Sequence, residues 1–558
     1  MDAKQDIEER RPAVPDGEAG PEERPDDAAK VASVTRSAAM MSACTLASRA
    51  TGFVRTWAMA FALGNTVLAA GFSLANNMPN MIYELVAGGA LAAAFVPIYH
   101  QQRNQISREA GTEYARNLLS IALIALGLVS ILASVFAPQV MATQSIFSSA
   151  SSETVGYAVW FFRFFAFQII CYGVSAIFSG LLNAEREFFW PAVSSIFMNI
   201  ISIATFLSFP FVSEVDETAG LVVLAVGITL SIAVMACVQI PALARLGFRF
   251  RFRVRLRGAA LGDTMRLALP AIASTAVNLV ALSFMNSCAL VVADNGPASI
   301  SYAWMWYQFP YGVLGVALST ALFTEMSEYA SKHEWEGFTR SFRFGLKSTW
   351  LLIIPMAVLV YVCASQLIGL YAAGRFTAED IVPVADLLRA WSINLPLYAA
   401  FMYVSQAYSA LKDMKTVAVV NTAMTVVQVL LYMTLTGVFF PGFSIGLVGI
   451  AVSDIIKYIV VNVILLALLR KRSDRLQLRL ILVPTAKILV ASLVGGVVGE
   501  VVNVFLRSFL SMDNILGAFV GLVVTGAVSL AVILVAAKLL HVEELDGAIA
   551  ALRRRLGR

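Results

Sequence analysis

The chain has 558 residues, of which 59% are hydrophobic and only 14% are charged. Soluble proteins are closer to half apolar and a quarter charged, so this composition excludes an ordinary set of soluble domains. The net charge is +5, although the first thirty residues alone hold ten acidic and five basic residues. The sequence therefore predicts a polytopic membrane protein that begins with an acidic tail.

The N-terminal segment is charged and Pro-rich, and it lacks the apolar stretch of a secretory signal peptide. We expect residues 1–35 to form a disordered cytoplasmic tail. The cysteines lie inside apolar runs and the histidines are far apart in sequence, which predicts buried thiols and no metal site. These residues are Cys44, Cys171, Cys237, Cys288 and Cys363, and His100, His333 and His541.

Long apolar runs alternate with short charged segments along the rest of the chain. A membrane-spanning helix needs roughly 20 apolar residues. By this measure the sequence predicts an all-α integral membrane protein with fourteen transmembrane helices, at 37–62, 66–98, 115–140, 154–182, 190–212, 219–246, 264–293, 299–328, 342–371, 380–411, 415–440, 443–469, 483–507 and 514–540.

Basic residues are concentrated in alternate loops, which predicts that both termini lie in the cytoplasm. The predicted outer loops carry only Arg375 and Arg507 as exceptions. Membrane orientation thus explains the basic charge, and we expect no nucleic-acid partner. The predicted inner segments carry Arg103, Arg108, Arg186, Arg249, Arg251, Arg253, Arg255, Arg257, Lys332, Arg340, Arg343, Lys412, Lys415, Lys471, Arg472, Arg475, Arg479, Arg553, Arg554, Arg555 and Arg558.

A weak internal repeat relates the two halves of the chain. Gly88 to Phe95 resembles Gly315 to Leu322, and Pro79 and Pro310 are 231 positions apart. A shift of this size spans six helices, so the repeat predicts two parallel six-helix lobes with a substrate site between them. Chance similarity between Ala/Gly/Leu-rich helices is the alternative. The predicted units are the tail 1–35, an N-lobe 36–246, a basic linker 247–263, a C-lobe 264–470, and 471–558 with two extra helices and a basic C-terminus.

The first predicted helix contains two arginines, Arg49 and Arg55, which follow Ser48 and flank Gly52. A charged residue at the centre of a membrane helix costs about 2.5–3.5 kcal/mol on insertion scales and usually faces a cavity. Arginine binds phosphate and carboxylate groups with two parallel hydrogen bonds. The pair therefore predicts an anionic ligand, with Gly52 allowing a bend. Pairing of an arginine with Glu84, or snorkelling of Arg55, is the alternative.

The second predicted helix is interrupted by Pro79 and carries asparagines on either side of it, at Asn76, Asn77 and Asn80, with Glu84 one turn later. Proline removes a backbone donor and breaks helices. Gln308 and Pro310 form the matching interruption of the eighth helix. Broken helices at equivalent places in two repeats indicate a transport site and its gate. A passive proline kink is the alternative.

Other charges within predicted helices have local explanations. Asp386 with Arg389, and Asp454 with Lys457, are spaced as neutralising i,i+3 pairs. Residues 248–257 alternate apolar and basic side chains. That pattern fits either an extended segment on anionic headgroups or a simple orientation signal.

Several motifs together resemble one family, the MurJ/MviN lipid II flippases of the multidrug/oligosaccharidyl-lipid/polysaccharide exporter superfamily. Each motif is weak alone, but six occur in the expected order between residues 36 and 540. They are Ser48-Arg49 with Gly52-Phe53 and Arg55; Pro79-Asn80; Ala94-Phe95-Val96-Pro97-Ile98-Tyr99; Phe309-Pro310 with Gly312-Val313 and Gly315-Val316-Ala317-Leu318; Gly374-Arg375-Phe376-Thr377; and Tyr408-Ser409 with Asp413 and Lys415-Thr416.

The resemblance implies fourteen helices, a cationic central cavity between the lobes, and a groove at helices 13 and 14 for a polyprenyl tail. Of the family's cavity charges, Arg49 and Arg55 carry over, and Glu84 is additional. Positions that carry charge in better-known members hold other residues here, namely Thr56, Ala70, Tyr83, Gly88, Trp304, Met305 and Gln308.

The sequence thus predicts a flippase, not an enzyme, in the bacterial cytoplasmic membrane. It would move lipid II or a related polyprenyl-diphosphate lipid to the outer leaflet by alternating access, for peptidoglycan synthesis. We expect no cofactor, and coupling to the membrane potential or an ion gradient. A transporter of another polyprenyl-linked oligosaccharide, a drug/cation antiporter of the same superfamily and a membrane-embedded glycosyltransferase are the alternatives. The predicted substrate-binding residues are Ser48, Arg49, Arg55, Asn76, Asn77, Asn80, Glu84 and Gln308, and the predicted gate residues are Gly52, Pro79 and Pro310.

Overall fold

A computed structural model describes residues 25–85, 95–147, 152–255, 259–312, 316–472, 477, 479–511 and 513–542. Within these residues all regular secondary structure is helical, which confirms the predicted all-α class for this part of the chain. The helices are α1 Pro25–Leu63, α2 Val67–Tyr83, α3 Val96–Gln105, α4 Arg108–Val135, α5 Ala137–Ala142, α6 Ser152–Phe165, α7 Gln168–Ala184, α8 Phe189–Val215, α9 Glu217–Cys237, α10 Ile240–Arg245, α11 Ala259–Val292, α12 Gly296–Pro310, α13 Val316–Ser331, α14 Trp335–Val362, α15 Ala364–Gly369, α16 Ala378–Ala410, α17 Met414–Leu435, α18 Val448–Arg472, α19 Arg479–Arg507 and α20 Ile515–Leu539.

Within the described ranges, nine helical stretches are long and apolar enough to cross a membrane. They lie in α4, α8, α9 with α10, α11, α14, α17, α18, α19 and α20. A tenth crossing results if α6 and α7, which meet at an angle of 47°, count as one span. The other predicted crossings fall on α1, on α2 with α3, on α12 with α13, and on α16, which are either shorter or more polar. The chain is therefore a multi-pass membrane protein.

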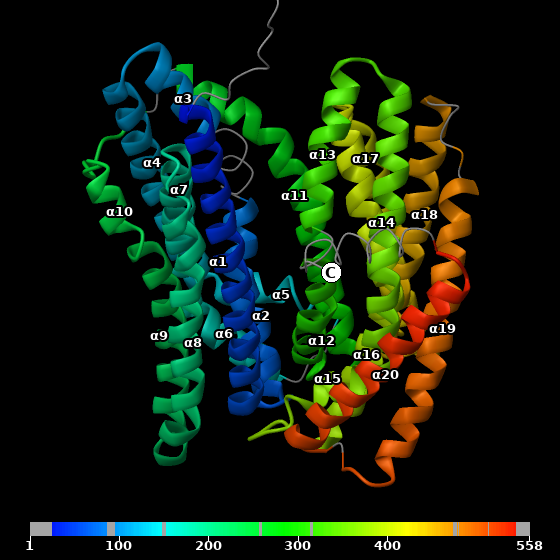
Figure 1. Cartoon of the computed structure of the whole chain (residues 1–558). Coiled ribbons are helices and arrows are strands. Elements are labelled where there is room, and N and C mark those ends of the chain that lie inside the picture. The colour runs from blue at the N-terminus through cyan, green and yellow to red at the C-terminus, as the bar shows by residue number, and fades with distance from the viewer. Residues whose placement is uncertain are drawn as a thin grey trace, which may run out of the picture.

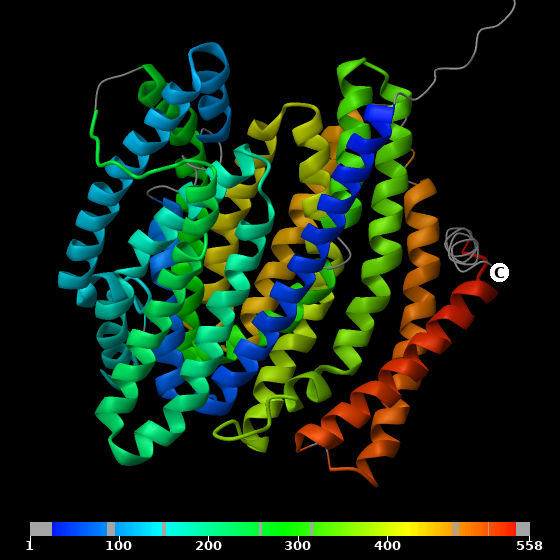
Figure 2. The ribbon, with the colours of Figure 1, turned by 60° about the vertical axis from the view of Figure 1, so that its left-hand side comes forward.

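The two halves of the chain gather on opposite sides of the molecule (Figure 1). We call α1–α10 the N-terminal half and α11–α20 the C-terminal half. The lower end of the bundle in Figure 1 holds the turns at 63–67, 215–217 and 507–515, and the upper end holds those at 105–108 and 331–335. Figure 2 shows α1 running the length of the bundle and α20 crossing α19 obliquely.

Aromatic side chains fill the core of the N-terminal half. Phe72 of α2 makes edge-to-face contacts with Phe161, Phe165 and Phe206, each with ring centroids 5.5 Å apart. All four rings are at most 2% exposed. Such edge-to-face pairs add to the stabilisation from burial of apolar surface. They fix α2 against α6 and α8, so that the opposite face of α2 is free to line the interior.

Glycines allow α19 to pack closely between α14 and α20. A Cβ atom at Gly495 would collide with Ile533, and one at Gly499 would collide with Ser529 and press on Val362. Small residues permit this close approach, which is how helices commonly associate in membranes. The Gly-rich stretch of α19 therefore serves helix packing.

A buried polar cluster also holds α19 in place. Asn503 is 1% exposed. Its Oδ1 accepts hydrogen bonds from Gln366 Nε2 at 2.5 Å and from Thr525 Oγ1 at 2.6 Å, and its Nδ2 donates to the carbonyl oxygen of Val362 at 2.9 Å. One amide thereby connects α19 to α14, α15 and α20. Hydrogen bonds of this kind are favoured in a membrane because water is not available as a partner.

The segment 248–255 runs in extended form along α4. The amide side chain of Asn117 bonds both backbone groups of Arg255, at 3.0 and 2.6 Å. Glu113 forms salt bridges of 2.9 Å with Arg253 and Arg255. Of its three phenylalanines, Phe250 and Phe252 are 47% and 64% exposed, whereas Phe248 packs against the core of the N-terminal half. The backbone of this basic segment is thus fixed to the N-terminal half, while the side chains of Phe250 and Phe252 remain exposed.

Two expectations about buried and disordered regions need correction. α1 begins at Pro25, so residues 25–35 of the predicted tail are helical, while 1–24 lie outside the described residues. The prediction that all cysteines are buried holds for Cys288 and Cys363. Cys237 is exposed and the remaining two are half-buried, because helix faces turned towards lipid accept a thiol as readily as the core does. Of the two repeated motifs, residues 88–94 and 315 lie outside the described residues, whereas 316–322 belong to α13.

Candidate functional site

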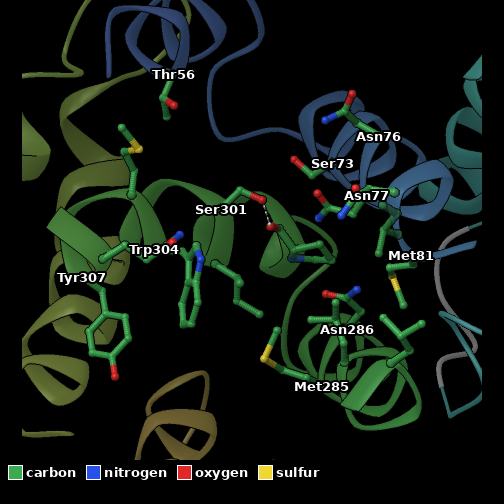
Figure 3. Close-up of a pocket in the computed structure, with 18 of the residues that line it drawn as sticks. Thr56, Ser73, Asn76, Asn77, Met81, Met285, Asn286, Ser301, Trp304 and Tyr307 are labelled. Atoms are coloured by element: carbon green, nitrogen blue, oxygen red, sulfur yellow. Dashed lines mark hydrogen bonds between the residues drawn. The ribbon is translucent and has the colours of Figure 1, made fainter. Parts of the chain in front are cut away.

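A cavity of about 620 Å³ lies between the two halves, and both halves contribute to its lining. Figure 3 shows part of the lining, with Thr56 of α1, Asn76 and Asn77 of α2, Asn286 of α11 and Trp304 of α12 around a common space. The polar and charged side chains in the lining are Arg55, Thr56, Ser73, Asn76, Asn77, Asn80, Glu84, Tyr172, Ser202, Ser231, Asn278, Asn286, Ser301, Tyr307, Gln308, Asn394, Tyr398, Gln428, Tyr432, Asp454, Lys457 and Tyr458.

The two arginines of α1 have different surroundings. Arg55 lines the cavity, as does its neighbour Thr56. The guanidinium group of Arg49 instead lies against Gly312, just beyond the end of α12, where a Cβ atom would collide with it. Six residues on a straight helix rotate the side-chain direction by about 120°. α1 continues through Gly52 as one helix, and the two guanidinium groups lie on different sides of it.

Ser48 also lies away from the cavity lining. Its carbonyl oxygen accepts a hydrogen bond from Nδ2 of Asn199 at 3.2 Å, and the same Nδ2 donates to Oγ1 of Thr51 at 2.9 Å. Asn199 belongs to α8 and approaches Gly52 to ordinary contact distance. This face of α1 is therefore used for packing against α8.

The predicted polar residues of α2 all line the cavity. Asn80 donates from Nδ2 to Oε1 of Glu84 at 2.9 Å, one turn further along the same face. The predicted break at Pro79 is wrong in position, because α2 continues to Tyr83. A proline whose neighbours still form the surrounding helical bonds kinks a helix without ending it. Residues 84–85 extend the helix with π-helical backbone, and residues 86–94 lie outside the described part of the chain.

The interruption predicted at Pro310 stays a prediction, because backbone at 311–312 is still π-helical and residues 313–315 lie outside the described part of the chain. α12 ends at Pro310, and Gln308 lies in the cavity lining. Pro310 itself is buried. Pro310 is thus the last residue of α12, whereas Pro79 lies four residues before the last residue of α2.

A polar network that the sequence did not predict forms the C-terminal wall of the cavity. Its centre is Asp454 of α18, which accepts hydrogen bonds from Trp391 at 2.9 Å, Gln428 at 2.6 Å and Tyr432 at 2.5 Å. Lys457 donates to Oε1 of Gln428 at 2.9 Å. The expected i,i+3 neutralisation is therefore indirect, since Gln428 lies between the two charged groups. By contrast, Asp386 and Arg389 form a direct salt bridge of 2.7 Å.

The charges in the lining are balanced. Within the described residues the lining has two cations, Arg55 and Lys457, and two carboxylates, Glu84 and Asp454. The cationic cavity that the family resemblance implied is thus replaced by one with equal numbers of cations and carboxylates. Both carboxylates already accept hydrogen bonds from amide side chains. In the same part of the chain no group of three or more His, Cys, Asp or Glu side chains could hold a metal ion.

The α1–α2 turn joins the N-terminal half to α12. Tyr302 donates to the carbonyl oxygen of Gly64 at 2.6 Å, and Ser299 donates to Oδ1 of Asn65 at 3.1 Å. Asn295 donates to the carbonyl oxygen of Asn65 at 2.9 Å. All of these are partly or fully buried bonds between segments about 230 positions apart. They close the molecule at its lower end.

A second contact at the lower end joins α1 to the segment after α15. The backbone N–H of Arg375 donates to the carbonyl oxygen of Phe61 at 3.0 Å. Gly64 and Gly374 have φ of +65° and +61°, and a Cβ atom on either would collide with the opposing backbone. Glycine is required at both positions because it alone combines this φ with such close approach. The guanidinium of Arg375 also lies 5.3 Å from the ring centroid of Phe209.

Sequence reasoning found the N-terminal wall of the cavity and missed the C-terminal one. The signals on α2 were local, since three asparagines and a glutamate stand on one helix within nine residues. The partners of Asp454 come instead from α16 and α17, between 22 and 63 positions away. The sequence showed that Asp454 and Lys457 lie within an apolar stretch, but it could not show which side chains from other helices bind them.

Comparison with known proteins identifies the family and the fold. The family model described as "Lipid II flippase MurJ" matches residues 59–520. A probable lipid II flippase MurJ of Thermotoga maritima is 27% identical over 504 residues, covering 90% of this chain and 96% of the relative. One of Rhizobium meliloti is 26% identical over 430 residues, covering 76% and 78%. A solved structure of the lipid II flippase MurJ in an inward closed conformation has a TM-score of 0.73 at 20% identity, over 90% of this chain and 99% of that one. The chain therefore belongs to the MurJ family of the lipid II flippases.

Proposed function

We propose that this protein moves lipid II from the inner to the outer leaflet of the bacterial cytoplasmic membrane. The observation that supports this most is the polar cavity enclosed between the two halves of a membrane protein of this family. Lipid II carries a disaccharide and a pentapeptide on a polyprenyl diphosphate. Its headgroup cannot cross hydrocarbon unaided, because burying unpaired charges and polar groups costs too much free energy.

The chain crosses the membrane fourteen times in this proposal. Residues 36–246 and 264–470 form two parallel six-helix lobes, and α19 and α20 add two crossings. The long apolar helices and the gathering of each half on its own side support this division. The helices α1, α2, α12 and α16 line the cavity, and the polar residues that they carry there make their apolar stretches shorter or less hydrophobic.

Both termini lie in the cytoplasm, so that the lower end of the bundle faces outward. The basic loops at the upper end support this orientation. The contacts of Gly64 and Asn65 with α12 then close the outer exit of the cavity. Transport proceeds by alternating access: the outer contacts break and contacts at the inner end form while the headgroup is enclosed.

The headgroup binds between the two walls. Arg55 takes the diphosphate, since a guanidinium can form two parallel bonds to phosphate oxygens. Asn76, Asn77, Asn80 and Gln308 offer amide groups to the sugars, and Glu84 offers a carboxylate to an amine of the peptide. The balanced charge of the lining suits a headgroup that carries both acidic and basic groups. Ser48 contributes to the packing of α1 against α8, and Arg49 packs against Gly312 just beyond the end of α12.

The polyprenyl tail stays in lipid along α19 and α20. Their outward faces carry large apolar side chains that are more than half exposed, namely Val497, Val501, Val504, Phe505, Leu516 and Val535. Exposed apolar surface of this kind suits lipid chains. The close packing of α19 on α14 supplies a rigid support for such a groove.

The protein acts as a transporter with no catalytic step of its own, and it needs no cofactor. Transport draws on the membrane potential or an ion gradient, since moving one charge is worth about 2.3 kcal/mol per 100 mV.

Depletion of the protein in its native bacterium, with labelling of lipid II in each leaflet, tests the function. The proposal predicts that lipid II accumulates on the inner leaflet and disappears from the outer one. A normal distribution between leaflets with blocked polymerisation would instead favour a membrane-embedded glycosyltransferase.

A further inference from the structure

A buried lysine on the C-terminal wall, Lys457 of α18, lines the cavity and is only 5% exposed. Its Nζ donates a hydrogen bond to Oε1 of Gln428 at 2.9 Å. An ammonium group has three N–H donors. The described residues supply one hydrogen-bond acceptor for it, so two donors remain for a group that enters the cavity.

Asp454 balances the charge of Lys457 without occupying those donors. Its carboxylate is held by Tyr432, Trp391 and Gln428, and Gln428 in turn accepts from Lys457. A charge is tolerated in a protein interior when an opposite charge and hydrogen bonds compensate it. The bridging amide therefore holds the lysine close to its counter-charge and leaves its other donors available.

A second polar group on the same wall is also incompletely bonded. Asn394 is 1% exposed, lines the cavity, and donates from Nδ2 to the hydroxyl of Tyr307 at 2.9 Å. Its Oδ1 has no hydrogen-bond partner among the described residues. Nearly all buried polar atoms are paired, so an orphaned acceptor in a cavity wall indicates a donor on a ligand.

Aromatic rings surround these two groups. The ring of Tyr398 lies 6.1 Å from that of Tyr307 and 5.5 Å from that of Tyr458, and all three line the cavity. Aromatic side chains combine an apolar face with polar edges and hydroxyls. A wall of this composition suits a sugar ring or a peptide better than it suits an isolated phosphate.

We propose that Lys457 and Asn394 form a second headgroup subsite on the C-terminal wall of the cavity. Lys457 binds a carboxylate of the sugar–peptide part, and Asn394 accepts a hydrogen bond from one of its hydroxyl or amide groups. The inference rests on the proposed function, in which Arg55 faces the diphosphate from the opposite wall. The two cations then hold the two ends of one headgroup, and closure of the halves brings both into contact with it.

Binding of two lipids to the purified full-length protein in nanodiscs tests this subsite. Lipid II and undecaprenyl diphosphate share the prenyl chain and the diphosphate, but only lipid II has sugars and carboxylates. We expect Lys457→Gln to weaken lipid II binding by about tenfold or more, the loss typical of a hydrogen bond to a charged group. Its binding of undecaprenyl diphosphate should stay within about twofold of the wild type, whereas Arg55→Gln should weaken both.

Two further variants keep the test valid. Lys457→Gln leaves Asp454 uncompensated and can reduce stability, so the double variant Lys457→Gln/Asp454→Asn removes both charges at nearly constant volume and should show the same selective loss. The matched control is Arg389→Gln/Asp386→Asn, which removes a salt-bridged pair outside the cavity lining and should change neither affinity.

The outcomes are distinguishable. Wild-type affinity for lipid II in both Lys457 variants would overturn the subsite. Equal losses for lipid II and undecaprenyl diphosphate would also overturn it, because the lysine would then serve the diphosphate. Failure of the wild type to bind lipid II would overturn the proposed function itself, and the subsite with it.

Discussion

Tyr302 of α12 donates a hydrogen bond to the carbonyl oxygen of Gly64 at 2.6 Å, across the boundary between the two halves of the protein. The tyrosine is fully buried. Gly64 adopts a φ of +65° that brings its backbone within reach. Together with the bonds of Asn65 to Asn295 and Ser299, this bond connects the end of the first helix to the helix that lines the other side of the cavity. In the proposed function these contacts hold the outer gate closed.

Tyr302→Phe should shift the protein towards conformations that are open at the lower end. The substitution leaves the carbonyl oxygen of Gly64 buried without a donor, which costs about 1–3 kcal/mol. Spin labels at Val215 and Phe440, which are 89% and 60% exposed in the two halves, would report the separation by pulsed electron resonance. The background for this measurement lacks the five native cysteines. An unchanged distance distribution in Tyr302→Phe would show that the bond does not hold the gate.

Arg55 and Arg49 should differ in their effect on substrate binding. Arg55→Ala removes a cavity cation and should abolish complementation in a strain that depends on this protein, while Arg55→Lys should restore it only in part because the bidentate geometry is lost. Arg49 contacts Gly312 rather than the cavity, so Arg49→Lys should retain most of the activity. If lipid II affinity falls as far in Arg49→Ala as in Arg55→Ala, the assignment of Arg55 alone to the ligand is wrong.

The position of Arg49 shows which parts of the site could be predicted from the sequence and which could not. The length of the apolar runs and the polar residues of α2 were sufficient to predict the all-α membrane fold and one wall of the cavity. The sequence could not show which face of α1 turns inward, because that depends on the contact of Asn199 with Thr51 from a helix 148 positions later. It also placed the break of α2 at Pro79, whereas packing of Phe72 and its neighbours carries the helix on to Tyr83.

The Asp454 network was missed for a related reason. An aspartate and a lysine at i,i+3 spacing are typical of a local salt bridge, and the intervening amide of Gln428, 26 positions before Asp454, could not be predicted from that spacing. Networks assembled from side chains on separate helices become visible only when tertiary packing is known.

Asn503→Leu should destabilise the C-terminal part of the protein. It leaves the amide N–H group of Gln366 and the hydroxyl of Thr525 without their acceptor, at about 1–3 kcal/mol for each buried group. Thermal unfolding in detergent should show a lower midpoint, and limited proteolysis should release α19 and α20 earlier. Val501→Ala is the matched control on α19. Val501 is 64% exposed, so its truncation should leave the midpoint of thermal unfolding unchanged. Equal midpoints for Asn503→Leu and the wild type would contradict the role of the cluster.

Asp413 should make stability depend on pH at the upper end of the bundle. It caps α17 by accepting from the backbone and hydroxyl of Thr416, and it pairs with Arg472 at 2.5 Å. The hydrogen bond from Thr416 is the main cause that lowers the pKa of Asp413 in the folded state, and Arg472 adds to it. The resulting stabilisation is present above the unfolded value of about 4 and is lost as the pH falls through the lower folded value.

Asp413→Ala should therefore lower the free energy of unfolding at pH 7 by about 1 kcal/mol, the usual worth of an N-cap. The deficit should shrink as the pH falls below about 4, because the wild-type carboxylate then becomes protonated. Asp413→Asn keeps a capping side chain and removes the charge, so it separates the contribution of the helix cap from that of the ion pair. The ion pair with Arg472 is worth at most about 1 kcal/mol, because the side chain of Arg472 is 44% exposed. A deficit for Asp413→Ala that is constant between pH 7 and 3 would contradict the assignment.

Movement of lipid II by the purified protein tests the central claim most directly. The protein is reconstituted into vesicles whose lipid II is first confined to the inner leaflet, and the fraction that becomes accessible to a membrane-impermeant reagent outside is followed over time. The account predicts rapid exposure with the wild type, and exposure at the protein-free rate with Arg55→Ala at equal protein content. Wild-type vesicles that expose lipid II no faster than protein-free vesicles, or an Arg55→Ala variant as fast as the wild type, would contradict transport of the headgroup through this cavity.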